Sequence, residues 1–164
     1  MFGFGHSEND AIDLLKNDHK EVNAMFEQYE SGKDTTRASE KAQLARKICR
    51  ALTVHATIEE EIFYPVVRRD VGSAKDLIGE AAVEHQSLKD IISRLETAPP
   101  SDPLYDAGVK VLGEYVKHHV KEEEGELFPK VRASRINLDA LGKRMLERKS
   151  QLEGTIGRKL RHAA

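Results

Sequence analysis

The chain carries one pattern of histidine and glutamate twice. In each copy a histidine is followed by glutamates four and five residues later and by a proline ten residues later. The copies begin at His55 and His119, and a single histidine precedes each at nearly the same separation, His19 and His85. This internal duplication supplies four imidazoles and two repeated carboxylates. Together these are enough ligands for two metal ions.

The spacing within each copy suits metal binding. Residues four apart lie on one face of an α-helix, with Cβ atoms about 5–6 Å apart. An imidazole and a carboxylate so placed can bind one metal ion, or the carboxylate can bridge two. The predicted ligands of this dinuclear site are His19, His55, Glu59, His85, His119 and Glu123. Such mixed donors suit iron, with manganese and zinc as alternatives. A bridging oxide or hydroxide would leave one position open for a small molecule.

The elements that must position these ligands are helices. Apolar residues recur at helical spacing in four blocks, and each block carries one of the four histidines on its apolar stripe. One histidine there is usually a hydrogen-bonded core residue, but four histidines with two glutamates are costly to bury without a metal. Short connections predict an all-α, up-down-up-down antiparallel four-helix bundle over residues 1–134.

Local signals predict where these helices begin and end. Asp10 is expected to cap the first helix, and Ser31-Gly32 to end it. Pro65 and Pro129 follow the ligand motifs and are expected to kink or close their helices.

Residues 135–164 have no counterpart in the duplication. From about Leu138 to Arg161 they predict an additional basic amphipathic helix, packed on the bundle or extending from it, although Gly154 and Gly157 weaken it. Its basic face is either solvated or a docking surface for a partner or an acidic surface.

Composition excludes several classes of protein. The net charge of −2 gives no general attraction to nucleic acid. Cys49 is the only cysteine, which excludes an internal disulfide and predicts a buried thiol. No stretch approaches the roughly 20 apolar residues of a membrane span, and the first ten residues lack signal-peptide features. We therefore expect a soluble, cytoplasmic monomer or small homo-oligomer.

The motifs resemble those of hemerythrin-like domains, the family named for its His-His-Glu cation-binding pattern. The matching segments are Asp18-His19, His55-x-x-x-Glu59-Glu60, Glu84-His85 and His119-x-x-x-Glu123-Glu124, and the resemblance covers about residues 10–131. It implies a non-haem di-iron centre that reacts with dioxygen, peroxide or nitric oxide. Bacterial members thought to act against peroxide belong to the same family.

Two departures from the oxygen carriers of that family leave the ligand set open. The carriers have a second histidine one turn after the third, where this chain has Lys89. Their last helix has a carboxylate five residues after its histidine, so Glu124 competes with Glu123. Candidates for an extra donor or a supporting residue are Glu60, Glu124, Tyr115 and His118.

With one histidine fewer, the metal pair is expected to be more open than in a carrier. We therefore expect catalase-like decomposition of hydrogen peroxide, in which the metals carry the redox chemistry. The alternatives are an oxygen or nitric oxide binding or sensing module, and an iron-handling protein without turnover. Hydrolytic chemistry is not expected, since no phosphate loop or serine nucleophile motif is present.

Overall fold

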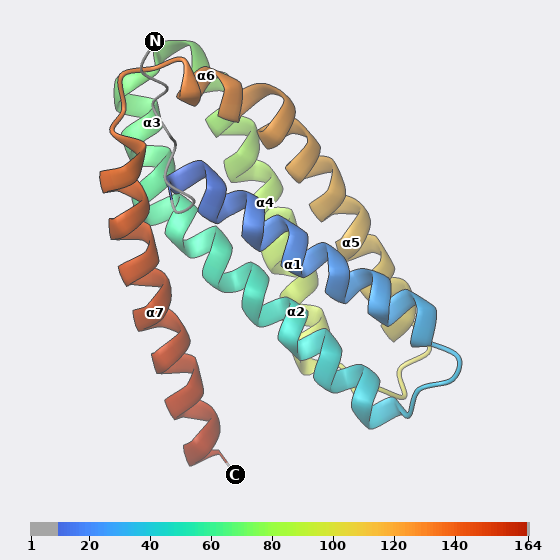
Figure 1. Ribbon diagram of the computed structural model, residues 1–164. Coiled ribbons are helices and arrows are strands. Elements are labelled where there is room, and N and C mark those ends of the chain that lie inside the picture. The colour runs from blue at the N-terminus through green and yellow to red at the C-terminus, as the bar shows by residue number, and fades with distance from the viewer. Residues whose placement is uncertain (1–9, 164) are drawn as a thin grey trace.

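The computed structural model describes residues 10–163, and every regular element in that range is helical (Figure 1). The four histidine blocks form the long helices α1 (Ala11–Gly32), α2 (Ala38–Ile58), α4 (Lys75–Thr97) and α5 (Tyr105–Glu122). These helices pack in a ring, with α1 against α2 and α5, and α4 against α5 and α2. The prediction of an all-helical protein is confirmed. Residues 1–9, on which the signal-peptide expectation depends, lie outside the described range.

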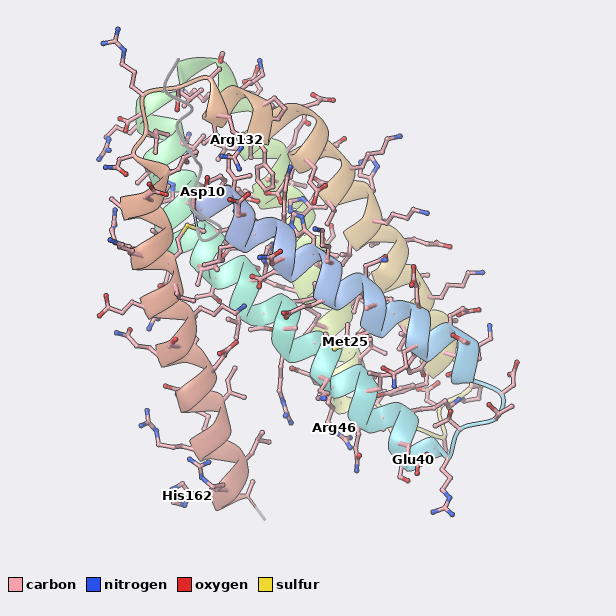
Figure 2. The ribbon with its side chains drawn as sticks, viewed as in Figure 1. Asp10, Met25, Glu40, Arg46, Arg132 and His162 are labelled. Atoms are coloured by element: carbon pink, nitrogen blue, oxygen red, sulfur yellow. The ribbon has the colours of Figure 1, made fainter. Side chains whose placement is uncertain are left out.

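The first helix begins as the sequence predicts. Asp10 caps α1, because its side chain accepts a hydrogen bond from the backbone N–H of Asp13 at 2.9 Å. The Arg132 guanidinium donates to Asp10 at 2.7 Å and to Asp13 at 2.9 Å. Figure 2 shows Arg132 beside the start of α1. This contact clamps the end of the second ligand motif to the beginning of the first helix.

Both ligand motifs run into a π-helical turn instead of a helix end. The helical chain continues from α2 through Glu59–Phe63 into α3 (Tyr64–Asp70), and from α5 through Glu123–Leu127 into α6 (Phe128–Arg132). A short 3-10 helix, Gly72–Ala74, then leads from α3 into α4. Single π turns inside α-helices are frequent at functional sites. The duplication seen in the sequence is therefore repeated in the backbone geometry.

Pro65 and Pro129 were expected to kink or close their helices, and they close neither, because the helical chain continues into α3 and α6. Pro65 and Pro129 lie in the first turns of α3 and α6, where a missing N–H costs no hydrogen bond. The residue before each proline completes the π turn, with Tyr64 N–H bonding the Glu59 carbonyl in the first copy. The wider turn thus carries the helix past a proline that would break a regular α-helix.

The bundle interior has two apolar clusters, one on each side of the histidines. One contains Ile12, Leu15, Ile58, Phe63, Val67, Leu127, Phe128, Leu141 and Met145. The other contains Val22, Ile48, Cys49, Leu52, Leu88, Ile92, Leu112 and Val116. Each histidine lies between residues of the two clusters along its own helix, so the polar groups form a layer between them.

Cys49 is buried in the second cluster, as predicted. Burial raises the pKa of its thiol to about 12, and the charge of Glu96 adds to that effect. Within the described residues, no helix has the length and apolar character needed to cross a membrane.

Helix α7 (Leu138–His162) lies against α1 and α2 (Figure 1). Asn137 caps it by accepting the Ala140 N–H at 3.0 Å. Leu141 and Met145 are buried against the bundle, and the helix continues through Gly154 and Gly157. Its final turns are largely exposed. Apolar packing therefore anchors α7 from Leu138 to Leu152, and the turns after Leu152 are largely exposed.

Candidate metal centre

The six predicted ligands converge in the layer between the apolar clusters. All six side chains are buried: His19, His55, Glu59, His85, His119 and Glu123. Each histidine comes from a different long helix, and each glutamate opens one of the π turns. Because the helices pack in a ring, residues far apart in the sequence meet at one depth.

The ligand atoms form two groups that share Glu59. The His19 group consists of His19, His55, Glu59 and Glu123, and the His85 group of Glu59, His85 and His119, each with ligand atoms within 4.8 Å of one another. Oε1 of Glu59 lies 3.0 Å from Nε2 of His55, and Oε2 lies 3.2 Å from Nε2 of His85. One carboxylate thus faces both groups, as a bridging ligand would.

Glu123 and Glu124 occupy different places. Oε2 of Glu123 lies 3.3 Å from Nε2 of His19 and 3.5 Å from Nε2 of His119. Glu124 lies behind His19, where its carboxylate is 2.8 Å from Nδ1. The geometry therefore places Glu123 among the candidate ligand atoms and Glu124 behind the candidate ligand His19.

A second carboxylate holds every one of the four imidazoles from behind. Measured to Nδ1, the pairs are His19–Glu124 at 2.8 Å, His55–Asp18 at 2.9 Å, His85–Glu60 at 2.9 Å and His119–Glu84 at 3.3 Å. Since an ionised carboxylate only accepts, Nδ1 carries a hydrogen, which leaves Nε2 as the ring nitrogen that faces the centre. This arrangement is typical of metal-binding histidines.

The supporting carboxylates follow the duplication. The acid before each single histidine, Asp18 or Glu84, supports the motif histidine of the same copy. The glutamate after each motif glutamate, Glu60 or Glu124, supports the single histidine of the other copy. The duplication thus extends to the residues behind the ligands.

Several buried atoms in the centre have unused bonding capacity. Among the described residues, the buried side-chain atoms without a hydrogen-bond partner are His19 Nε2, His55 Nε2, Glu59 Oε1 and Glu123 Oε2. In the His85 group, Nε2 of His85 and Nε2 of His119 face each other at 3.1 Å. Two unprotonated ring nitrogens at this distance repel each other unless a proton or a metal ion lies between them. The donors therefore fit a metal pair, which would satisfy all of these atoms.

The carboxylates around the histidines raise the pKa values of two imidazoles, and a metal ion would have to displace the protons bound there. Burial alone would lower the pKa of His55, but Glu59 and Asp18 outweigh it and raise that pKa well above its usual range. The pKa of His85 is also raised: burial opposes the rise, and the carboxylates of Glu59 and Glu60 cause it. Without metal, the raised pKa values favour protonation of these imidazoles, and such protons would compete with a cation.

Tyr64 belongs to the centre, although the sequence analysis missed it. Its hydroxyl lies 2.6 Å from Glu123 Oε1 and 3.2 Å from Glu59 Oε2. The same oxygen is 3.4 Å from Nε2 of His85 and 3.5 Å from Nε2 of His119. Burial raises the Tyr64 pKa well above its usual range, and the charges of both glutamates raise it further.

A signal for Tyr64 is present in the duplication. Tyr64 lies nine residues after His55, and the residue nine after His119 is Phe128. The Phe128 ring stacks on His19 at a centroid distance of 5.9 Å, while Tyr64 lies 5.5 Å from the His85 ring. The two copies thus differ by one hydroxyl directed into the site.

The other proposed donors are not brought among the ligands. Tyr115 is 50% exposed on the outer side of α5. His118 is also exposed, with Nε2 3.1 Å from Glu122 and 3.8 Å from Glu84. Glu60 lies behind His85 in a supporting place.

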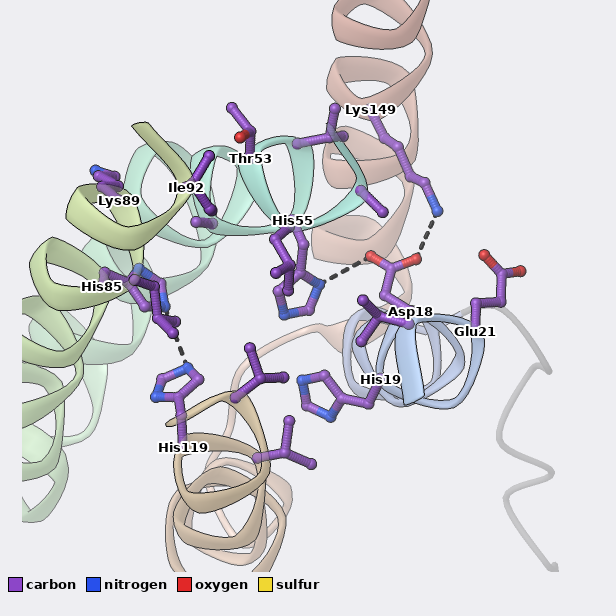
Figure 3. Close-up of a pocket in the computed structure, with 18 of the residues that line it drawn as sticks. Asp18, His19, Glu21, Thr53, His55, His85, Lys89, Ile92, His119 and Lys149 are labelled. Carbon is purple, nitrogen blue, oxygen red and sulfur yellow. Dashed lines mark hydrogen bonds and ion pairs between the residues drawn. The ribbon is translucent and has the colours of Figure 1, made fainter. Parts of the chain in front are cut away.

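A cavity of about 90 Å³ reaches all four histidines (Figure 3). Its apolar wall includes Val22, Leu52, Leu88, Ile92, Val116 and Val120, and Lys89 and Lys149 also line it. Tyr64 is not among the lining residues. A molecule of a few atoms can therefore approach the four histidines through this cavity.

Comparison with known proteins gives a consistent picture. The family model for the hemerythrin HHE cation binding domain matches residues 10–131. Rv2633c of Mycobacterium tuberculosis is 26% identical over 148 residues, 88% of each chain. A crystal structure of its homolog from Mycobacterium kansasii, described as a hemerythrin HHE cation binding domain-containing protein, has a TM-score of 0.75 at 26% identity, covering 93% of this chain and 92% of that one.

A DNA nickase from Nostoc sp. is 31% identical over 120 residues. The match covers 73% of this chain, and the chain spans only 33% of the length of that relative.

Proposed function

Since this chain belongs to the hemerythrin HHE cation-binding domain family, we propose that its centre binds two iron ions and decomposes hydrogen peroxide. His19 and His55 would hold one ion, His85 and His119 the other, and Glu59 and Glu123 would bridge them. The unpartnered Nε2 and carboxylate oxygens support this assignment. Mixed imidazole and carboxylate donors suit iron.

Tyr64 would be a further donor in the His85 group. Its hydroxyl lies 2.6 to 3.5 Å from two imidazole nitrogens and two carboxylate oxygens, separations expected for atoms that share one metal ion. Lys89 has the place of the carriers' additional histidine, but it points to Glu60 and donates to it at 2.7 Å. The Tyr64 oxygen would therefore replace the missing imidazole.

The position of the Tyr64 hydroxyl is the single observation that favours peroxide decomposition over reversible oxygen binding. A phenolate is an anionic oxygen donor, so it stabilises an oxidised iron ion more than a neutral imidazole does. Haem catalases likewise use a tyrosine ligand. Reversible oxygen carriage needs a stable reduced pair, which such a donor disfavours. In the metal-free protein the raised pKa keeps the phenol protonated, and cations beside it would favour ionisation.

When bound, an iron pair supplies the two-electron redox chemistry that converts two hydrogen peroxide molecules into two waters and one dioxygen. The residues of the chain hold and shield that chemistry. The supporting carboxylates fix the imidazole rings, and the apolar wall limits the cavity to a molecule of a few atoms.

The test is metal analysis of the purified chain, then a visible spectrum and an oxygen-electrode trace after peroxide addition. We expect about two irons per chain and oxygen release over many turnovers. His55→Ala should lose iron and turnover, whereas His118→Ala, an exposed histidine outside the centre, should lose neither. A single stable spectral change without oxygen release would favour a carrier or sensor and reject the peroxide reaction.

A further inference from the structure

Helix α7 contacts Asp18, the carboxylate behind His55, through Lys149. Nζ of Lys149 donates to Oδ1 of Asp18 at 2.5 Å, and Oδ2 of Asp18 is 2.9 Å from Nδ1 of His55 (Figure 3). The three side chains link α7 through α1 to α2. Lys149 lies beyond residues 10–131, so this contact comes from outside the segment that the family model matches.

The lysine has no equivalent in the second copy. Glu84 is the counterpart of Asp18 and supports His119 at 3.3 Å. The basic side chain near it is His118, whose Nε2 is 3.8 Å away and whose side chain is 64% exposed. Because α7 has no counterpart in the duplication, it strengthens the support of one motif histidine and not of the other.

A second lysine makes a similar contact in a more exposed setting. Lys89 donates to Glu60 at 2.7 Å, but their side chains are 47% and 34% exposed. The side chains of Lys149 and Asp18 are 22% and 11% exposed. Exposed ion pairs contribute little and are screened by salt, whereas less exposed pairs hold their geometry better. Lys149 is therefore better placed to fix a supporting carboxylate.

We propose that Lys149 is a positioning residue that fixes Asp18 and, through it, the ring orientation of His55. Docking of α7 would then control how tightly the His19 group holds its metal ion. This inference rests on the proposed function, since it assigns His55 as a ligand. Without the lysine, Asp18 can rotate towards water and the His55 ring loses its fixed partner. Loss of such outer contacts typically lowers metal affinity about 10–100-fold.

The neighbouring residue on α7 offers a matched control. Arg148 pairs with Glu61 at 2.7 Å, which also ties α7 to the bundle but lies in a more exposed position and supports no histidine. The variants to compare are Lys149→Ala, the conservative Lys149→Arg, and Arg148→Ala. Arginine can still donate to Asp18, so Lys149→Arg should restore what Lys149→Ala loses.

Two measurements separate positioning from docking. In the metal-free chain, NMR follows the His55 Nδ1–H resonance, which should exchange with solvent faster in Lys149→Ala than in the other chains. In the iron-loaded chain, release of iron to a chelator should be about tenfold faster in Lys149→Ala and within about twofold of wild type in Arg148→Ala and Lys149→Arg.

Equal effects of Lys149→Ala and Arg148→Ala would overturn the proposal, because they would show that α7 only needs to be docked. An unchanged His55 resonance in Lys149→Ala would also overturn it. If the wild-type chain binds no iron, the proposed function fails, and the NMR comparison still decides whether Lys149 positions His55.

Discussion

The Tyr64 hydroxyl donates a hydrogen bond of 2.6 Å to the carboxylate of Glu123. This bond joins the first ligand motif to the second. In the second motif the equivalent residue is Phe128, which stacks on His19 and brings no polar atom into the centre. One hydroxyl thus breaks the symmetry of a duplicated site, so two bound metal ions would have different surroundings.

Removal of that hydroxyl should impair the proposed reaction while leaving the packing of the core intact. Tyr64→Phe keeps the ring, and the second copy shows that phenylalanine fits the equivalent place. We expect turnover of peroxide to fall at least about tenfold, on the scale of a lost supporting contact, and any phenolate-to-iron absorption to disappear. Tyr115→Phe, which changes an exposed ring, is the control. Full activity in Tyr64→Phe would rule out tyrosine as a functional donor.

The two adjacent glutamates of the second motif should respond differently to the same change. Glu123→Gln alters a buried carboxylate that faces both donor groups, so we expect fewer than two irons per chain. Glu124→Gln alters only the support of His19, so both irons should bind, with affinity about 10–100-fold lower. Metal analysis during chelator titration measures both effects. If instead Glu124→Gln lost iron and Glu123→Gln only bound it more weakly, Glu124 would be the ligand.

Metal uptake should release protons and weaken as pH falls. The pKa values of His55 and His85 are raised in the metal-free chain, chiefly by neighbouring carboxylates acting against burial. Each of these histidines, when protonated, must lose the proton on Nε2 before that nitrogen can bind metal. Calorimetry in buffers of different ionisation enthalpy should therefore detect proton release at neutral pH. Binding without proton release would show that these imidazoles are already neutral.

The same shifts predict how the stability of the metal-free chain depends on pH. A histidine whose folded pKa is raised stabilises the fold fully below its unfolded pKa of about 6.5, and this contribution disappears as pH rises through the folded value. The pKa of Glu59 is lowered: burial opposes the shift, and His55 and His85 cause it. Its contribution is present above its unfolded pKa, about 4.3, and disappears as pH falls through the lowered folded value.

Urea unfolding of the metal-free chain from pH 4 to pH 9 should therefore show stability falling on the alkaline side (about pH 6.5 and above). The iron-loaded chain should not show that alkaline loss, since metal replaces the protons. Equal pH dependence in both forms would contradict this account.

The clamp at the start of α1 should contribute to stability independently of metal. Arg132→Ala leaves the carboxylate of Asp10, which is 1% exposed, without its guanidinium partner. We expect the free energy of unfolding to fall by about 2 kcal/mol, because a buried charge loses a hydrogen-bonded partner. Lys130→Ala, an exposed change in the same helix, should have little effect. Equal losses in the two variants would show that the clamp is not specific.

Local patterns in the sequence were enough to predict the helical class, the Asp10 cap and the six histidines and glutamates that meet in the centre. Helical periodicity places His19, His55, His85 and His119 on interior stripes, and the spacing of four puts each motif glutamate beside its histidine. These features depend on residues within a few turns of one another, which is why one sequence reveals them.

The remaining features depend on which distant segments meet. Tyr115 was the tyrosine that the sequence suggested as a donor, but the structure leaves it exposed and directs Tyr64 into the centre. The contact of Lys149 with Asp18 joins residues 131 positions apart and requires α7 to pack beside α1. The different places of Glu123 and Glu124 likewise follow from the π turn and the position of His19. Sequence spacing therefore determined which four histidines and two glutamates converge. The packing of the helices decided that Tyr64 joins them and which carboxylates and lysine lie behind them, because those contacts are made between elements.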